Sequence, residues 1–296
     1  MSTMIKVIYI GGIGHSGSTF LDIMLGDCKD CQSTGQLADV FRNDSWCRAC
    51  GTSIQKCRFW NQIYGSMSGL DLKRIRKLGP KAEKERKILS FMFPTKLSKA
   101  YAKANDKVFS AIKEKTKKGA IVDSSKNLSR ALSLLRYSRH QVYFIHLIRD
   151  PRGFITSQNK RREKKGKSIR LLYPMIHWLL KNSVCSLIIK NIYRKRYIRV
   201  TFEDLLMNPK RCISEIEKLT QSDMTIPKKK LETRQAFTQK HIFSGNFVST
   251  KKKVLFDDTR IKSNRLEFYS DCRYWYTIGW LSWFFGYRKR QSYLED

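Results

Sequence analysis

Residues 5–26 read IKVIYIGGIGHSGSTFLDIMLG, and this stretch decides the fold. Its first six residues are typical of a short buried strand, and residues 18–25 place apolar side chains on one side of a helix. The glycine loop GGIGHSGST, residues 11–19, lies between them. A loop in this setting points main-chain N–H groups and a helix N-terminus at one place, which binds an anion without side-chain charge. The predicted anion-binding residues are Gly14, His15, Ser16, Gly17, Ser18 and Thr19.

The same loop differs from a nucleotide-hydrolysing P-loop at one position. Gly12, Gly17 and Thr19 stand where the pattern G-x-x-x-x-G-K-[ST] requires them, but Ser18 replaces the lysine. That lysine normally reaches the terminal phosphates of a triphosphate. Its absence argues against ATP or GTP hydrolysis and against a P-loop kinase.

A second candidate anion site lies in IHLIRDPRGFITSQNKRR, residues 145–162. The pattern places Arg149 at the end of a strand and Ser157 about two turns into the following helix. An arginine fork and a hydroxyl in this arrangement can bind one phosphate. A ligand with phosphate groups at two ends, such as an adenine nucleotide with a 5′-phosphosulfate and a 3′-phosphate, would use both sites.

The rest of the chain predicts an α/β fold. Further strands are expected at 120–123, 142–148 and 197–202, and helices at 128–137, 171–193 and 203–219, the last broken at Asn208-Pro209. Strands that alternate with helices predict a parallel sheet flanked by helices on both faces. We expect one domain over residues 1–296, with a basic helical insertion at about 60–118 that breaks at Gly79-Pro80 and at Pro94, and an aromatic C-terminal helix at 274–290.

The charge composition of the chain indicates which classes of binding partner it favours. Lys and Arg number 59 against 25 Asp and Glu, and the resulting charge of +34 favours acidic ligands. The basic residues are spread through the chain and no base-reading motif is present, so nucleic acid is the weaker interpretation.

The start of the chain shows no signal peptide and no segment is long enough to span a bilayer, which predicts a cytoplasmic protein. The segment YWYTIGWLSWFFGY, residues 274–287, offers a peripheral contact with the inner face of the membrane.

In order and spacing, several segments resemble the PAPS-dependent sulfotransferases of bacterial and tyrosylprotein type. PAPS is 3′-phosphoadenosine 5′-phosphosulfate. The loop at 11–26 is similar to the family's 5′-phosphosulfate loop, and LIRDPRGFITS is similar to its 3′-phosphate motif. The other segments with this resemblance are IVDSSKN at 121–127, YIRVTFEDLLMNP at 197–209, HIFSGN at 241–246 and CRACGTSIQKCRFW at 47–60.

The resemblance implies a P-loop-like sulfotransferase core and an enzyme that transfers a sulfuryl group from PAPS to a hydroxyl or amine, releasing 3′,5′-ADP, with no obligatory metal. It assigns Lys126 and His15 to the transferring group, and Gly245 and Asn246 to the nucleotide. The acceptor is left open among a glycan, a glycolipid and a small metabolite, with an anionic acceptor favoured by the basic insertion. A catalytically inactive PAPS-binding homologue and a basic nucleic-acid-binding protein are the alternatives.

The general base is the least defined residue. Some relatives have a glutamate where this chain has Gln36, and an amide is no useful proton acceptor. Asp39, about one helical turn further on, is the candidate substitute, with Asp123 and His15 as the others.

The cysteines suggest a metal as one alternative. Cys28-x2-Cys31 and Cys47-x2-Cys50 are 15 residues apart, which is spacing typical of zinc sites. A disulfide among Cys47, Cys50 and Cys57 and free thiols are the other interpretations. Cys185, Cys212 and Cys272 are expected to be ordinary buried residues.

Overall fold

A five-stranded parallel sheet organises the chain. The computed structural model describes residues 4–39, 46–47, 49–84, 91, 93–170, 172–243, 253–257 and 279–287. Within these ranges the strand order is β2-β5-β1-β6-β7, so the first strand lies at the centre. The strands are β1 (Lys6–Gly12), β2 (Cys31–Ser33), β5 (Ala120–Asp123), β6 (Gln141–Ile148) and β7 (Tyr197–Thr201). The predicted α/β class with a parallel sheet is confirmed.

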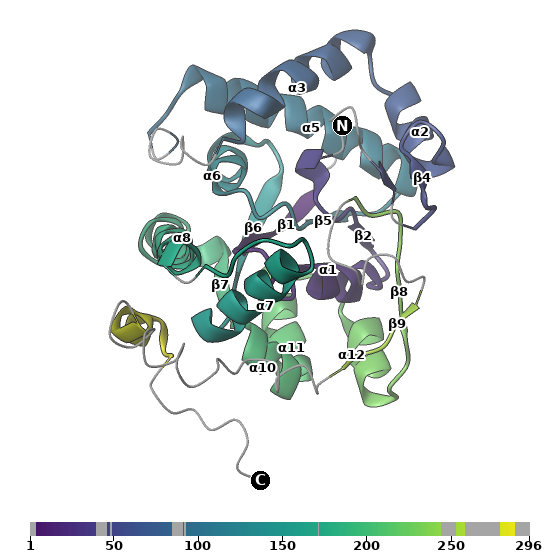
Figure 1. Cartoon of the computed structure of the whole chain (residues 1–296). Helices are drawn as coiled ribbons and strands as arrows, with labels where there is room; N and C mark the ends of the chain where they lie inside the picture. Colours follow the sequence, from purple (N-terminus) through teal and green to yellow (C-terminus); the bar gives the residue numbers. More distant parts are fainter. Residues whose placement is uncertain are drawn as a thin grey trace.

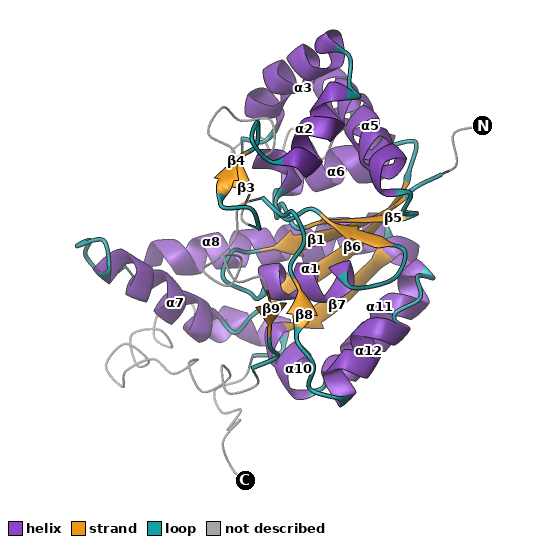
Figure 2. Ribbon diagram, turned by 90° about the vertical axis from the view of Figure 1, so that its right-hand side faces the viewer, coloured by secondary structure: helices purple, strands orange, loops and turns teal. Residues whose placement is uncertain are grey.

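Helices cover both faces of the sheet (Figures 1 and 2). Val7 and Tyr9 of β1 pack with one set of helices, and Ile8 and Ile10 pack with the other, because successive side chains of a strand point to opposite faces. The first set is α2 (Arg58–Gly65), α3 (Gly69–Ala82), α5 (Lys96–Thr116) and α6 (Leu128–Tyr137). The second set includes α1 (Ser18–Gly26), α10 (Phe202–Met207), α11 (Pro209–Thr220) and α12 (Thr225–Glu232).

The remaining elements flank this core. A helical run combines α8 (Leu172–Ser183), the π-helical turn Val184–Ile189 and α9 (Lys190–Ile192), so the predicted helix at 171–193 is confirmed over its described residues. Helix α7 spans Pro151–Glu163. Two small antiparallel sheets pair β3 (Trp46–Cys47) with β4 (Thr52–Ser53) and β8 (Phe237–Thr238) with β9 (Lys253–Val254). The short 3-10 helices are η1 (Leu37–Asp39), η4 (Arg194–Arg196) and η7 (Gly279–Phe285).

One sequence-based expectation needs correction, and two elements were not predicted. The helical insertion does not break at Gly79-Pro80, since α3 runs through both residues. Pro80 has no N–H to donate to the carbonyl of Arg76 four residues earlier, and α3 ends two residues after it, at Ala82. Strand β2 was not predicted because CQS has no apolar run, and α12 was not predicted because its sequence TIPKKKLE has a weak apolar stripe.

The aromatic C-terminal segment is described only over 279–287. There, Phe285 and Tyr287 are buried against Trp178 of α8. Trp283 and Phe284 are exposed. The predicted helix at 274–290 otherwise lies outside the described residues. Over the described ranges, every helix is too short or too polar to cross a bilayer.

Candidate active site

The glycine loop turns sharply between β1 and α1. His15 has φ 64° and Gly17 has φ 82°, both in the left-handed region. Gly12 has φ 118°, and a Cβ there would lie 2.2 Å from the carbonyl oxygen of Leu147. A Cβ at Gly17 would lie 2.6 Å from the ring of Phe202. The backbone path therefore requires glycine at positions 12 and 17.

Hydrogen-bond donors collect at this turn. Gly17 is the N-cap of α1, and no side chain among the described residues caps the helix. Ser16 is fully buried, and its Oγ has no hydrogen-bond partner in the described part of the chain. Ser18 and Thr19 form the buried first turn of α1. Uncapped N-terminal amides and an unpartnered buried hydroxyl are what an anion such as a phosphate or sulfate would satisfy.

The second predicted anion motif meets this loop at His15. Arg149 directly follows β6, which lies beside β1, and its Nη1 donates a 2.8 Å hydrogen bond to the carbonyl oxygen of His15. The Oγ of Ser157 on α7 lies 3.1 Å from His15 Nδ1. Segments 134 residues apart in sequence thus form one site.

Phe202 supports both halves of the site. Its ring lies under the guanidinium of Arg149, with the Cζ atom 4.5 Å from the ring centroid, and also packs against Gly17. A cation over an aromatic face is held without being neutralised. Sequence analysis did not single out Phe202, although it belongs to the segment YIRVTFEDLLMNP.

Lys126 lies in the turn between β5 and α6, with φ 61°. It is half-buried, and the hydroxyl of Tyr9 holds the turn by donating a 2.7 Å hydrogen bond to the carbonyl of Asn127. Burial lowers the pKa of Lys126 to about 8, while the charges of Asp22 and Asp39 act in the opposite direction. Lys126 is therefore mostly protonated at neutral pH.

His15 is neutral at the same pH. Burial is the main cause that lowers the pKa of His15 to about 4, and the positive charges of Arg161, Lys126 and Arg149 contribute to the same shift. Arg161 is an exposed residue of α7. The predicted residues His15, Lys126, Arg149 and Ser157 therefore lie in one electropositive site.

The structure distinguishes between the candidate general bases. Asp123 is fully buried and pairs with Arg130 through contacts of 2.8 and 2.9 Å. This ion pair leaves Asp123 unsuited to accept a proton from a substrate. Asp39 ends η1, is half-buried and lies near enough to Lys126 for its charge to act on that lysine. Gln36 precedes η1, and its main-chain N–H donates to the carbonyl of Phe243.

A buried carboxyl that sequence analysis missed lies near enough to Lys126 for its charge to act on that lysine. Asp22 of α1 is fully buried and accepts hydrogen bonds from Ser33 Oγ (3.0 Å) and Ser124 Oγ (3.2 Å). Burial raises the pKa of Asp22 to about 7. An acidic residue among the apolar positions of residues 18–25 was the available signal.

A cavity of about 380 Å³ opens beside η1. It lies next to the 3-10 turn that carries Asp39. Its walls come from η1, α3, α5 and α6, with Glu83 just after α3. The lining residues are Leu37, Ala38, Ile75, Arg76, Gly79, Pro80, Glu83, Tyr101, Asn105 and Arg130.

The predicted zinc quartet is not brought together. Cys28 and Cys31 pack in the core on the α1 side of the sheet, where Cys28 Sγ donates to the carbonyl of Asp223. Cys47 belongs to the opposite core. Cys47 and Cys50 instead group with Cys57 and His241. Cys185 and Cys212 are buried free thiols, as expected. Gly245, Asn246 and Cys272 lie outside the described residues.

Comparison with known proteins bears on this geometry. The model of a family described as "Sulfotransferase family" matches residues 8–225, about three quarters of the chain. No curated protein matches the sequence significantly.

Two solved structures share the fold. The sulfotransferase domain from the Synechococcus PCC 7002 olefin synthase is 16% identical with a TM-score of 0.54, and the match covers 97% of each chain. The sulfotransferase domain from the curacin biosynthetic pathway is 14% identical with a TM-score of 0.51, covering 96% of this chain and 99% of that domain.

Proposed function

The chain belongs to the sulfotransferase family, and from this membership we propose that it transfers a sulfuryl group from PAPS to a hydroxyl or amine of an acceptor and releases 3′,5′-ADP. In that reaction the acceptor atom attacks sulfur while the bond from sulfur to the phosphate oxygen breaks. The observation that carries the proposal is the convergence of two anion-binding motifs on His15, through Arg149 and Ser157.

The donor's two anionic ends would divide between the two halves of this site. The uncapped amides of α1 and the buried Ser16 hydroxyl suit the 5′-phosphosulfate. Arg149 and Ser157 suit the 3′-phosphate, because a guanidinium binds phosphate oxygens with two parallel hydrogen bonds. ATP and 5′-ADP carry no 3′-phosphate and would leave that half unpaired.

Fixed cations would stabilise the transition state. Lys126 is half-buried, and a positive charge withdrawn from water acts more strongly on the charge that develops during transfer. Neutral His15 would act by hydrogen bonding, with its orientation set by Ser157. These residues would do the work that a divalent cation does in many phosphoryl transfers.

In the proposed reaction, Asp39 acts as the general base. It immediately follows the two cavity-lining residues Leu37 and Ala38, and its charge acts on Lys126. An acceptor hydroxyl at that end of the cavity would have a carboxylate on one side and the transferring group on the other. Asp123 is unsuited because Arg130 holds it in a buried ion pair.

The same cavity would receive the acceptor. Leu37, Ile75 and Pro80 give it apolar walls, and Arg76 adds an exposed positive charge. This combination suits an acceptor with an apolar body and an anionic group, such as a glycolipid or an acidic metabolite, more than a neutral sugar. Arg76→Ala should then raise KM for an anionic acceptor and leave 3′,5′-ADP affinity unchanged.

We propose that the enzyme is located in the cytoplasm and makes a peripheral contact with the membrane. The exposed Trp280, Trp283 and Phe284 of η7 would enter the membrane interface. Cosedimentation with anionic vesicles tests this contact, and a triple alanine variant at these positions should stay in the supernatant. Equal cosedimentation of both proteins would contradict it.

The direct test is incubation with ³⁵S-labelled PAPS and a panel of lipid, glycan, peptide and small-molecule acceptors. Label should move to at least one acceptor with the wild type and not with Lys126→Ala. Tight 3′,5′-ADP binding without transfer to any acceptor would favour an inactive PAPS-binding homologue. Failure to bind 3′,5′-ADP would overturn the proposal altogether.

A further inference from the structure

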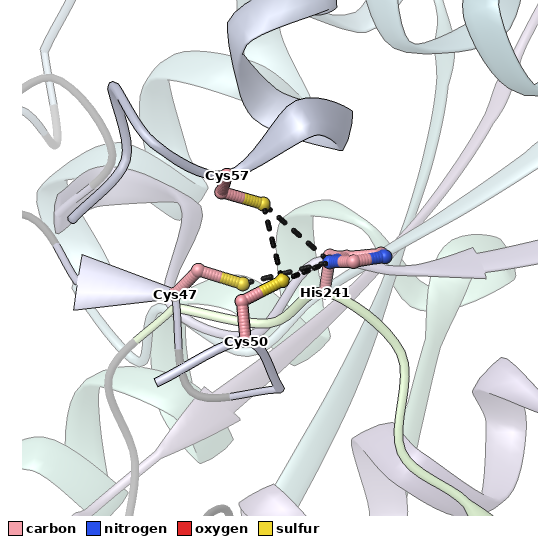
Figure 3. Close-up of side chains that lie close together, drawn as sticks. All are labelled: Cys47, Cys50, Cys57 and His241. Carbon is pink, nitrogen blue, oxygen red and sulfur yellow. Dashed lines mark hydrogen bonds between the residues drawn. The ribbon is translucent and has the colours of Figure 1, made fainter. Parts of the chain in front are cut away.

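Three thiols and one imidazole converge at the edge of the helical insertion (Figure 3). The Nδ1 atom of His241 lies 3.6 Å from Cys47 Sγ, 3.3 Å from Cys50 Sγ and 3.5 Å from Cys57 Sγ. The sulfurs of Cys50 and Cys57 are 3.6 Å apart. All four candidate ligand atoms lie within 4.8 Å of one another.

Hydrogen bonding does not account for this arrangement. A ring nitrogen of histidine has either one proton to donate or one lone pair to accept with, so it can satisfy one thiol and not three. Three sulfurs around one nitrogen are the expected geometry when all four atoms surround a metal ion.

The distances fit a tetrahedral zinc ion. With Zn–S bonds of about 2.3 Å and Zn–N bonds of about 2.0 Å, tetrahedral angles place sulfur about 3.5 Å from nitrogen and about 3.8 Å from another sulfur. The three sulfur–nitrogen distances and the Cys50–Cys57 distance agree with these values within about 0.3 Å.

We infer that Cys47, Cys50, Cys57 and His241 bind one Zn²⁺, through three Sγ atoms and the Nδ1 atom of the imidazole. Soft thiolate ligands with one imidazole favour zinc over magnesium, calcium or manganese. Four protein ligands leave no position for water or substrate, so the site is structural and takes no part in the transfer. On binding, each thiol releases its proton as the Zn–S bond forms, with no change of oxidation state.

The local backbone builds the first part of this site. Cys47 ends β3, and the turn to β4 brings Cys50 back beside it. Gly51 makes that turn possible with φ 64°, and its N–H donates a 3.0 Å hydrogen bond to the carbonyl of Cys47. Cys57 is the N-cap residue of α2, so the start of this helix fixes the third sulfur.

Phe59 and Trp60, in the first turn of α2, then orient the histidine ligand. The ring of Phe59 stacks on the imidazole of His241, with centroids 4.9 Å apart and an interplanar angle of 8°. The indole Nε1 of Trp60 donates a 2.9 Å hydrogen bond to the carbonyl of His241. The segment CRFW thus supplies a ligand, a stacking platform and a main-chain anchor, which leaves His241 little freedom to turn away.

Zinc here would fix one wall of the candidate active site. Phe243 forms isolated bridges with both Gly35 and Cys47. Its carbonyl accepts from the N–H of Gln36, at the start of the turn that leads to Asp39. The metal would therefore connect the segment after Lys240 to the β3–β4 hairpin. Through Phe243, it would also connect that segment to the wall that carries the candidate base.

Metal content is the first test. The full chain is purified without a histidine tag, without added metal and under reducing conditions, and zinc is measured by mass spectrometry. We expect about one zinc per chain in the wild type and loss of most of it in Cys50→Ser and in His241→Ala. Cys28→Ser is the matched control, since this buried thiol belonged to the alternative quartet, and it should retain the zinc.

A second measurement does not depend on variants that fold. The wild type is stripped with a chelator and titrated with Co²⁺, which should produce thiolate-to-cobalt charge-transfer bands and the intense visible bands of a tetrahedral site. Zn²⁺ should displace the cobalt, and stripping should lower Tm reversibly. Reduced wild type that contains no zinc and develops no such bands overturns the inference, as does a Cys50–Cys57 disulfide found by alkylation and peptide mapping.

Discussion

The guanidinium of Arg149 donates a 2.8 Å hydrogen bond to the main-chain carbonyl of His15. This bond joins the residue after β6 to the glycine loop after β1, so the two halves of the candidate donor site are one mechanical unit. A change at Arg149 should therefore affect both the 3′-phosphate half and the shape of the glycine loop.

Arg149→Ala should remove the preference for 3′,5′-ADP over 5′-ADP. A charge-assisted contact of this kind contributes about 2 kcal/mol, or about thirtyfold in Kd. Calorimetry with both nucleotides measures the ratio, and Arg211→Ala, at an exposed arginine on α11, serves as the control. Equal wild-type affinities for the two nucleotides would show that Arg149 does not recognise a 3′-phosphate.

Lys126→Ala should lower kcat by about 10²-fold or more and change 3′,5′-ADP affinity by less than about threefold, because its charge acts mainly on the transferring group. Single-turnover transfer and nucleotide titration give the two values. Lys103→Ala, at an exposed lysine on α5, should leave both unchanged. A parallel loss of binding and turnover would instead assign Lys126 to ground-state nucleotide binding.

The pH profile should report the same lysine. Burial lowers the pKa of Lys126 to about 8, so its positive charge is present below that pH and is lost as the pH rises through it. We expect kcat/KM to fall on this alkaline side. Lys126→Arg should extend activity to higher pH, because arginine stays protonated. An alkaline limb that does not move in the variant would assign it to another group.

Asp39→Asn should lower kcat by about 10²- to 10⁴-fold if Asp39 is the general base, with the melting temperature almost unchanged. Asp123→Asn is the contrasting variant. It removes one partner of the buried pair with Arg130 and should cost about 3 kcal/mol or more in stability. Full activity of Asp39→Asn would return the search for a base to His15, or to an acceptor that needs none.

Asp22→Asn tests the buried carboxyl through stability. Burial raises the pKa of Asp22 from its ordinary 3.8 to about 7, so the folded state holds this proton more tightly than the unfolded state. The stabilisation from that proton is fully present below about pH 4 and is lost as the pH rises through about 7. Relative to the wild type, the variant should gain stability across this window, by up to about 4 kcal/mol. Thermal unfolding from pH 4 to 8 measures the difference, and parallel profiles would contradict it.

Local signals were sufficient for the main elements. Helix α6 has the bounds expected for residues 128–137, and Pro94 and Asn208-Pro209 mark real helix boundaries. The strands at 120–123 and 142–148 were found because both are buried apolar runs. Such features depend on neighbours in sequence, whose periodicity and punctuation are directly readable.

The short and polar elements were missed for the opposite reason. Strand β2 consists of Cys31, Gln32 and Ser33, and it is a strand because β5 offers a parallel partner. Asp22 looked like one polar residue in an apolar helix. Its role depends on Ser33 and Ser124, which the sheet brings to it.

The sequence by itself determined the glycine loop, the strand-to-helix order and the residue types of the candidate donor site, because each depends on residues close together in the chain. Only the tertiary structure decided which cysteines share a site. Spacing favoured Cys28 and Cys31 as partners of Cys47 and Cys50, but the sheet separates the two pairs. The tertiary structure also brings His241 beside Cys47, although the two residues are 194 positions apart in the sequence. Spacing along the chain carries no information about such a contact, because the packing of distant segments sets the distance between them.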